Sequence, residues 1–570
     1  MNIKKLLLLY LSTNLISQVI PPFIGERFRS FRYLSTVGLI EDDLDLLLDP
    51  GRYFEIEKNI LYSGLSNFAT NNDLLFSGIS GAYFMFGFKN TFKPLGNVVP
   101  TSLLYAHRTL RMPQPNLING RGEGELFISE KYDTDGNGSF DSLHVEKAKS
   151  YSYLENKENP FFIGFSREIG EIIAGIFFFH LKLSNINEPA GHPIFNRFGN
   201  LYYLREEKDL ITLTLLEKEE WNGKGFVDTS TQQNIFGTSI YLKELFLNSD
   251  LGIQAGYGIN NLKISEDIFT TAYIDYNPGG VTSREDRNYA RFQDLNSSGS
   301  SYFLRLFTRR TRNQELSSED NLYFTFYGSG ISKTTSPFHR VEYIHLREDI
   351  GTGTLRETRN MDKVEGNVAY ESKINGLILG YRFKGFIDDE KRIFFAIGFF
   401  FNNNTSNSTS KVDSNFQVIN YFNDGDNQPS DPDDYTVTTT FTRVDELKSS
   451  YSRMSFELPV ACELKFNKSL LFRMGANPYF SFTENEQTLN PLFSSSIVTK
   501  TTRGDGTETV TTRPAQRSFG LRNLSKGKSS GVDFSYGLSY KIGKNLSIDL
   551  MGFSNLTDLS NWRVSVVFKF

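Results

Sequence analysis

The chain of 570 residues has a net charge of −5 and no basic run, which argues against a nucleic-acid partner. A single cysteine, Cys462, excludes an intramolecular disulfide framework. The mean hydropathy of −0.35, with no long apolar run beyond the N-terminus, excludes a bundle of membrane-spanning helices. The 51 Phe and 28 Tyr residues favour strands, so the composition predicts an all-β protein.

The first 18 residues have the pattern of a secretory signal peptide. Two lysines precede an apolar run at residues 6–16, which is too short to span a bilayer as a helix, since that needs about 20 residues. We therefore expect residues 1–18 to be a signal peptide. An N-terminal core helix is the alternative, but Pro21 and Pro22 stop the segment.

The next part of the chain, residues 19–72, differs in pattern from the rest. It carries an acidic stretch at residues 41–45 and a turn sequence, Asp49-Pro50-Gly51, before the first strand-like alternation. Three candidate strands come next in chain order, at residues 53–61, 76–88 and 102–107.

Residues 133–141 resemble the first nine positions of a calcium-binding loop of the EF-hand type. Oxygen atoms at the first, third and fifth positions can converge on one ion, and glycine at the sixth position allows the turn. The candidate ligands are Asp133, Asp135, Asn137, Ser139 and Asp141. His144 replaces the bidentate Glu of the twelfth position, so we expect at most weak binding that stiffens an outer loop. The alternative is a metal-free hairpin turn, which these residue types also favour.

From residue 161 onwards one unit recurs: an alternating strand, a short polar turn, a second strand and a long polar segment. The strand pairs are 161–166 with 173–183, 235–245 with 251–257, 302–308 with 322–328, 377–383 with 393–401, 454–466 with 470–476, and 532–540 with 546–550. The long segments are rich in Asn, Ser, Thr and Asp, and we expect solvent-exposed loops at 184–233, 261–299, 332–373, 403–438 and 484–530.

Two of the long segments carry recognisable motifs. Arg503-Gly504-Asp505 is the adhesion tripeptide recognised by animal integrins, with a simple loop turn as the alternative interpretation. Residues 423–434 are acidic, which indicates a solvated loop or, as the alternative, a surface that attracts cations.

The chain closes on a strand with one apolar face, formed by Trp562, Val564, Val566, Phe568 and Phe570. A strand that ends on a free aromatic residue resembles the closing strand of bacterial outer-membrane β-barrels, in which the terminal Phe is read by the machinery that folds and inserts the barrel. An ordinary half-buried strand is the alternative. If residue 570 lies in the periplasm, every short turn falls inside and every long segment falls outside, as in such barrels.

These strands predict a transmembrane antiparallel up-and-down β-barrel. The pairs and the closing strand make thirteen, and bacterial barrels have an even number, so residues 102–107 complete a barrel of about fourteen strands. Residues 53–61 and 76–88 would raise the number to sixteen, the alternative. We expect an N-terminal plug at 19–72 and the barrel at 73–570, in the bacterial outer membrane. A soluble sandwich or propeller would need more even turns.

The order of residues 31–51 resembles the N-terminal hatch of the long-chain fatty-acid transporter barrels. In that family a Gly-containing segment and an acidic pair precede an Asn-Pro-Ala turn, and the first strand comes after it. Here Gly38, an acidic stretch and Asp49-Pro50-Gly51 take these places, with Asp replacing Asn. That family has fourteen strands and passes hydrophobic substrates through a plugged lumen. The resemblance implies passive uptake of small hydrophobic compounds, with plug residues Phe23, Phe28, Phe31 and Tyr33 contacting the ligand.

No catalytic set emerges from the sequence, so we expect a protein that is not an enzyme. His180 is interpreted as a hydrogen-bonded residue of the barrel wall. A general diffusion porin and a non-transporting surface scaffold or adhesion barrel are the alternative functions. The expected partners are outer-membrane lipid, the barrel assembly machinery and a hydrophobic small molecule, with calcium as the one possible cofactor.

Overall fold

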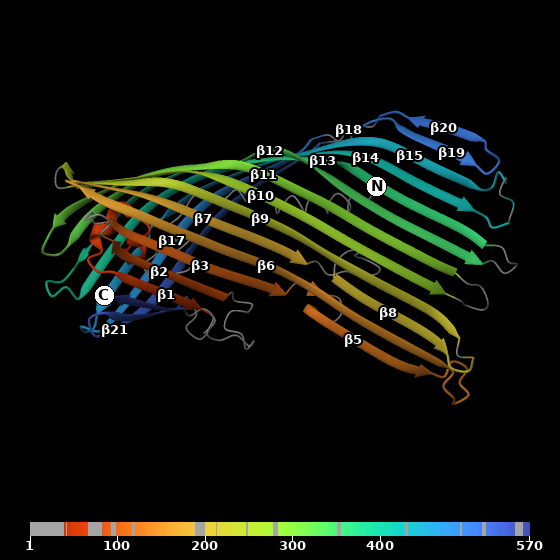
Figure 1. Cartoon of the computed structure of the whole chain (residues 1–570), viewed down its shortest axis with the longest axis horizontal. Coiled ribbons are helices and arrows are strands. Elements are labelled where there is room, and N and C mark those ends of the chain that lie inside the picture. Colours follow the sequence, from red (N-terminus) through yellow and green to blue (C-terminus); the bar gives the residue numbers. More distant parts are fainter. Residues whose placement is uncertain are drawn as a thin grey trace.

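The computed structural model is an antiparallel β-barrel whose strands continue far beyond the length needed to cross a membrane (Figure 1). It describes residues 39–41, 43–66, 82–92, 99–113, 115–116, 120–188, 200–212, 214–246, 249–276, 283–349, 355–426, 428, 431–490, 493–515, 520–552 and 563–570. The expected signal peptide at 1–18 lies outside these residues. Within the described residues no helix is both long and apolar enough to cross a bilayer.

Each wall strand pairs antiparallel with the next, and the last pairs with the first, so the barrel is closed. The wall strands are β1 (Ile60–Ser66), β2 (Ala82–Phe92), β3 (Val99–Pro113), β6 (Ser142–Ile169), β7 (Ile172–Glu188), β9 (Leu215–Phe246), β10 (Ser249–Tyr276), β11 (Ser283–Asn313), β12 (Ser318–Asp349), β13 (Leu355–Phe386), β14 (Ile393–Asn423), β15 (Tyr435–Glu457) with its continuation β16 (Val460–Lys465), β17 (Leu470–Leu489), β21 (Leu521–Ile542), β22 (Leu546–Gly552) and β23 (Arg563–Lys569). Closure is made by β1 and β23, with Leu61 opposite Phe568.

The described wall has sixteen strands, so the expected number of about fourteen is wrong and the alternative number matches. β15 and β16 form one wall strand that is interrupted at Leu458 and Pro459, since both pair with β14 and with β17. The two extra strands are β1 and β2. The sequence did not decide whether residues 53–61 form a wall strand, because this span contains two kinds of structure. It starts in η1 (Pro50–Glu55), a 3-10 helix, and it ends in the first two residues of β1. The wall therefore begins at Ile60, within the span 19–72 that the sequence assigned to a plug.

Six further strands extend the wall at one end: β4 (Pro115–Asn116), β5 (Gly120–Tyr132), β8 (Asn200–Asp209), β18 (Phe493–Ser494), β19 (Ile497–Arg503) and β20 (Glu508–Arg513). The turns that the sequence predicted between paired wall strands (β6–β7, β9–β10, β11–β12, β13–β14, β16–β17 and β21–β22) all lie at the opposite end, together with Phe570. There the backbone of Phe570 bonds to that of Asn59. This common polarity is the one predicted from the turn lengths, and it makes the short-turn end the periplasmic end. At the other end β10–β11 and β12–β13 are also joined by few residues, because the strands there take up most of the predicted loops.

The predicted long loops are mostly strand. β9, β12 and β13 each have 32 residues, whereas a strand crosses the membrane in about 9–11 residues. Large apolar side chains exposed on the outer face, such as Phe236, Phe324 and Phe534, gather next to the short turns and mark the membrane band. About 20 residues of each long strand continue beyond it, which at roughly 3.3 Å per residue is roughly 60 Å.

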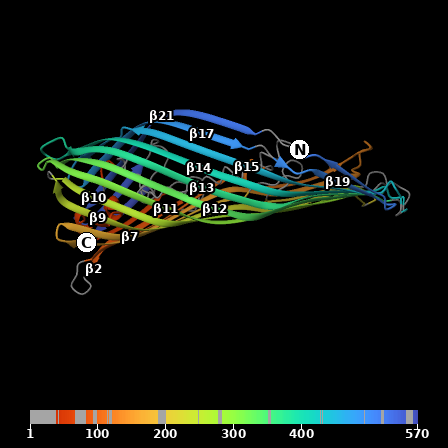
Figure 2. The same ribbon diagram turned by 90° about the horizontal axis from the view of Figure 1, so that it is seen from above.

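This distal part of β9 to β15, here called the outer sheath, comprises residues 215–234, 260–276, 283–300, 329–349, 355–374, 404–423 and 435–453. Its strands keep a period of two: on β10 the side chains of Leu262, Ile264 and Ile268 are buried, while Lys263 and Asp267 between them are exposed. The polar sequence forms sheet because every strand has a hydrogen-bonded neighbour on both sides. Figure 2 shows that the sheath flattens toward its far end.

Candidate functional site

The described residues that precede β1 form a short folded piece inside the barrel, here called the inner segment (residues 39–56 without residue 42). It contains α3 (Asp43–Leu47) and η1. The turn between them is fixed by Asp49, whose carboxylate accepts the Gly51 N–H at 3.2 Å, and by Pro50 at the start of η1. Leu44, Leu47 and Tyr53 are fully or almost fully buried.

Hydrogen bonds join the inner segment to strands on different sides of the barrel. The Gly51 N–H also donates to Ser239 Oγ on β9 at 3.2 Å. Lys89 Nζ on β2 donates to the Ile56 carbonyl at 2.6 Å. On β3, Ser102 Oγ donates to the Leu47 carbonyl at 2.8 Å and also contacts the Tyr53 hydroxyl. The inner segment therefore lies across the lumen, near the periplasmic end.

Charged side chains form a second set of contacts, here called the latch network. Its members are Glu41, Arg52 and Glu55 of the inner segment and Asp250, Arg309, Glu319, Arg382 and Lys384 of the wall. Glu41 lies 2.8 Å from Arg52, 3.3 Å from Arg382 and 3.3 Å from Lys384 (nearest N to O distances). Glu55 lies 2.8 Å from Arg52 and 3.0 Å from Arg309. Buried charges of this kind are tolerated only when they are paired.

The latch network is balanced across the boundary between segment and wall. On the segment two carboxylates face one guanidinium, a net charge of −1, and on the wall three cations face two carboxylates, a net charge of +1. The wall cations also hold partners of their own: Arg309 lies 3.0 Å from Asp250, and Lys384 lies 2.6 Å from Glu319. Loss of the inner segment would therefore leave most wall charges paired but one cation in excess.

Apolar contact comes from an aromatic tier on the wall, formed by Phe162, Phe177, Phe303 and Tyr327. The rings of Phe162, Phe177 and Phe303 stack in sequence, with centroids 5.7 and 6.3 Å apart. The tier belongs to one buried cluster with Leu44, Leu47 and Leu48 of the inner segment. The leucine side chains of the segment and the aromatic side chains of the wall thus pack in the same buried apolar cluster.

Glycines on the neighbouring strands let these rings lie flat against the wall. A Cβ atom on Gly237 would come within 2.1 Å of the Phe177 ring, and one on Gly376 within 2.2 Å of the Tyr327 ring. The same holds for Gly256 beneath Phe303, at 2.5 Å. Rings that lie over glycines stay close to the wall, so they form an apolar surface along the lumen and leave its interior free for other groups.

Several of the residues that the sequence singled out lie outside the described part of the chain. These are Phe23, Phe28, Phe31 and Tyr33, expected to contact ligand, and Trp562 of the closing strand. The other four residues of that strand lie as expected on one face: Val566, Phe568 and Phe570 are exposed, and Val564 is half-buried, whereas Ser565 and Val567 between them are buried.

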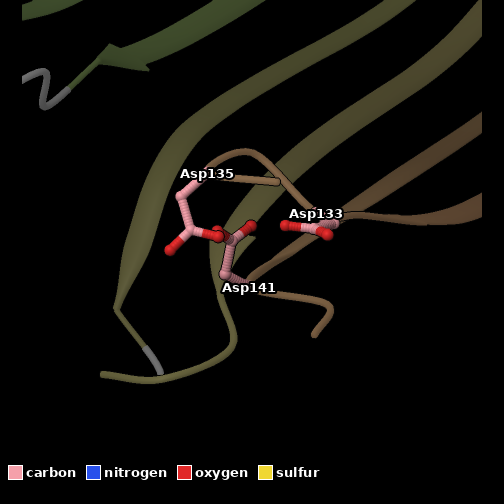
Figure 3. A group of neighbouring side chains, drawn as sticks. All are labelled: Asp133, Asp135 and Asp141. Atoms are coloured by element: carbon pink, nitrogen blue, oxygen red, sulfur yellow. The ribbon is translucent and has the colours of Figure 1, made fainter. Parts of the chain in front are cut away.

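The structure brings together three of the five candidate calcium ligands, at the turn between β5 and β6. Oxygen atoms of Asp133, Asp135 and Asp141 all lie within 4.8 Å of one another, and Figure 3 shows the three carboxylates grouped at the turn. Asn137 contacts this group as a hydrogen-bond donor: its side-chain amide donates to Asp135 Oδ2 at 2.7 Å, while its side-chain oxygen accepts the Ser139 N–H at 2.8 Å. These residues can offer a cation three carboxylates, without the bidentate Glu that a strong site needs.

Hydrogen bonds within the turn already engage the carboxylates. Asp133 accepts the N–H groups of Gly136 and Gly138 at 2.8 and 2.6 Å. Hydrogen bonds from the hydroxyl and the N–H of Thr134 hold the pKa of Asp141 below its usual value. The Asp141 carboxylate therefore stays ionised at neutral pH, as a calcium ligand must.

Two features bear on catalysis. The His180 Nδ1–H donates a hydrogen bond to the Asn234 side-chain oxygen at 2.7 Å, as expected for a wall residue. Residues 527–531 spell Gly-x-Ser-x-Gly, a motif that the sequence reasoning overlooked, but they lie within the straight strand β21. Ser529 there bonds to Ser481 on β17 at 2.7 Å. The sharp strand-to-helix turn that this motif needs in hydrolases is not present at these residues.

Sequence reasoning also missed the latch network. One signal was available: Arg382 stands between Tyr381, which is exposed, and Phe383, close to a short turn, so its side chain had to face the lumen within the membrane band. An ionisable residue at such a position is a functional candidate by default.

No family model and no curated protein matches the sequence. Among solved structures, a FadL homologue from Pseudomonas aeruginosa is 10% identical and covers 97% of this chain and 99% of its own, with a TM-score of 0.27. The ferripyoverdine receptor of the outer membrane of Pseudomonas aeruginosa is 9% identical, with 90% and 72% covered and a TM-score of 0.22. The FrpB iron transporter from Neisseria meningitidis is 9% identical, with 92% and 83% covered and a TM-score of 0.25.

Superpositions this distant carry no argument about function. The closed ladder, the common side of the predicted turns and the lipid-facing band identify the chain as a bacterial outer-membrane β-barrel protein.

Proposed function

We propose that the protein mediates passive uptake of small hydrophobic compounds across the outer membrane, with the inner segment as a plug that gates the lumen. The observation that carries this proposal is the double contact of the inner segment. Its leucines pack in one buried cluster with the aromatic tier, and its charges complete the latch network. The resemblance of residues 31–51 to the hatch of the long-chain fatty-acid transporter barrels supports the same function.

The proposed mechanism is an exchange of contacts. An apolar ligand that reaches the aromatic tier replaces Leu44, Leu47 and Leu48, so the apolar surface of the wall stays covered while the segment moves. The latch network limits the cost of this movement, because Arg309 and Lys384 keep Asp250 and Glu319 as partners. No energy source is needed beyond the concentration gradient of the ligand.

Planar-bilayer conductance tests the plug. The wild-type barrel should be almost silent, and deletion of residues 39–56 should produce steady single-channel currents. The deletion stops before Ile60 because β1 is part of the wall. Deletion of residues 497–513, which removes the β19–β20 hairpin far from the lumen, is the matched control and should stay silent.

The same recordings separate the alternatives. Large steady currents from the wild type would refute the plug and favour a general diffusion porin. A silent deletion variant that still migrates as a folded, heat-modifiable barrel would also refute it and favour a surface scaffold. Lipid or another hydrophobic compound that co-purifies with the wild type, and is lost from a variant with a polar aromatic tier such as Phe303→Gln, would support uptake of hydrophobic cargo.

Two partners and one ion complete the proposal. We propose that outer-membrane lipid surrounds the apolar band, and that the barrel assembly machinery reads the outward-facing row of the closing strand, Val564, Val566 and Phe568 on β23 with the terminal Phe570. We also propose that the turn at Asp133, Asp135 and Asp141 takes calcium weakly and stiffens the end of the β5–β6 hairpin. The latter rests on the convergence of three carboxylates within 4.8 Å.

A further inference from the structure

The β19–β20 hairpin carries the Arg503-Gly504-Asp505 sequence at its tip, at the far end of the outer sheath (Figure 1). β19 continues the sheet, because Thr436 to Thr440 of β15 pair with Val498 to Thr502. Within the hairpin, Lys500 and Glu508 form an ion pair at 2.6 Å. The sequence left open whether this tripeptide is only a loop turn, and the hairpin shows how it is displayed.

The turn is tight and closed by main-chain hydrogen bonds. The Arg503 N–H donates to the Thr507 carbonyl at 2.9 Å, and the Gly506 N–H donates to the Arg503 carbonyl at 3.0 Å. Gly506 has φ of 84°, a conformation that glycine adopts without strain. Arg503 and Asp505 are both exposed, so both charged groups of the tripeptide reach solvent at the tip.

A neighbouring loop holds the tip in place. The Gly504 N–H donates to the Asp434 carbonyl at 2.8 Å, and a Cβ atom on Gly504 would come within 2.4 Å of the Asp431 carbonyl oxygen. Asp434 is itself fixed, since its carboxylate accepts the side-chain amide of Asn423 at 2.9 Å. Close packing therefore explains why the middle residue of the tripeptide is glycine. The same packing holds the turn that carries the two flanking charged residues, and a turn that is already fixed loses less conformational entropy when a partner binds.

We propose that this tip is a recognition site for a cell-surface receptor of the animal integrin class, and that the protein has an adhesive function separate from transport. Asp505 supplies a carboxylate for a receptor-bound divalent cation, for which carboxylate oxygen is the preferred ligand. Arg503 supplies a guanidinium for a carboxylate of the receptor, a bidentate pairing that lysine cannot reproduce. Their Cα atoms are at most about 7.6 Å apart, because one residue separates them.

The sheath provides the access that such a partner needs. The hairpin lies at the end of strands that continue for roughly 60 Å of their own length beyond the membrane band. A large receptor can therefore reach the tip without contacting lipid. The inner segment and the aromatic tier play no part in this contact.

The test is direct binding of the purified full-length barrel, in detergent or nanodiscs, to a purified integrin ectodomain that recognises this tripeptide, in buffer with Mn²⁺. Wild type should bind, and EDTA or a cyclic peptide with the same tripeptide should abolish binding. Asp505→Glu moves the carboxylate by one methylene and should weaken binding at least about 30-fold, as should Arg503→Lys. Asp433→Glu makes the same chemical change at an exposed position of the neighbouring loop and should leave binding within about twofold.

Three results would overturn the proposal: absence of wild-type binding, binding that survives EDTA, or binding by Asp505→Glu equal to that of Asp433→Glu. Hydrogen exchange over residues 497–513 checks that each variant keeps the hairpin. Binding by the variant that lacks residues 39–56 should equal that of the wild type, which keeps this outcome independent of the transport proposal.

Discussion

Glu41→Gln is the sharpest test of the latch network. The carboxylate lies 2.8 Å from Arg52 and 3.3 Å from each of Arg382 and Lys384, and its side chain is 10% exposed. Glutamine has almost the same shape, so the substitution removes the charge and little else. Breaking a buried ion pair on one side costs about 3–5 kcal/mol, because the remaining charge stays buried without its partner.

The cost here should be smaller, because two of the three cations keep a second partner. Arg52 retains Glu55 at 2.8 Å, and Lys384 retains Glu319 at 2.6 Å. Arg382 retains hydrogen bonds to two neutral acceptors, the side chain of Asn321 on the wall and the carbonyl of Leu39 on the segment. We expect a loss of about 2 kcal/mol from the closed state, which is about 30-fold in the ratio of open to closed barrel.

Single-channel recording measures this ratio as the open probability, which should rise about 30-fold in Glu41→Gln. Glu365→Gln is the matched control. It also removes a paired carboxylate, 2.7 Å from Lys363, but on the exposed face of β13 in the sheath. Its open probability should equal that of the wild type. The double variant Glu41→Gln/Arg382→Gln should open less than the two single effects multiplied together, because it removes both charges of one pair.

One outcome would refute this reasoning: a Glu41→Gln barrel that is folded by heat-modifiability but opens no more often than Glu365→Gln. The inner segment would then be held by its apolar contacts and its other hydrogen bonds, and the ion pairs of the latch network would add nothing to the stability of the closed state.

Other parts of the molecule give three more predictions. Gly376→Ala should destabilise the barrel by about 1–3 kcal/mol, seen as a lower urea midpoint, because the new methyl group meets the Tyr327 ring; Gly330→Ala, with more room, should cost less. Calcium should protect the Asp133–Asp141 turn from proteolysis, and Asp135→Asn should abolish the protection while Asp267→Asn does not. The lowered pKa of Asp141 should keep this one ligand ionised to a lower pH than an ordinary aspartate. Amides at 404–423 and 435–453 should resist hydrogen exchange; exchange as fast as in free loops would contradict a sheath.

The membrane-crossing part of the fold could be predicted because its signals are local. Alternation in segments such as 532–540 and the turn at 543–545 predict a strand and its apolar side from adjacent residues alone, and the periplasmic position expected for residue 570 then gives its direction. The number of strands was harder, because β1 has only seven residues and comes shortly after a helical turn.

The outer sheath could not be predicted from local signals. Residues 402–410 read Asn-Asn-Asn-Thr-Ser-Asn-Ser-Thr-Ser, which has no apolar alternation and is typical of a loop. They are strand in β14 because β13 and β15 pair with them on both sides, from Ile378 opposite Asn402 onwards. Strand formation there depends on neighbours that are distant in sequence, and single-residue propensity cannot report them.

The latch network was out of reach for the same reason, since Glu41 and Arg382 are 341 positions apart in the numbering. Glycines of the wall nevertheless mark where the inner segment packs against it. A Cβ atom on Gly164 would come within 2.3 Å of the Tyr53 hydroxyl, one on Gly175 within 2.3 Å of Pro50, and one on Gly398 within 2.8 Å of Leu39. At these positions on β6, β7 and β14 the inner segment packs so closely that a wall residue with a side chain would collide with it. The wall is thus packed closely around the inner segment, so under the proposed uptake function a passing compound has to displace this segment from the positions that the wall leaves for it.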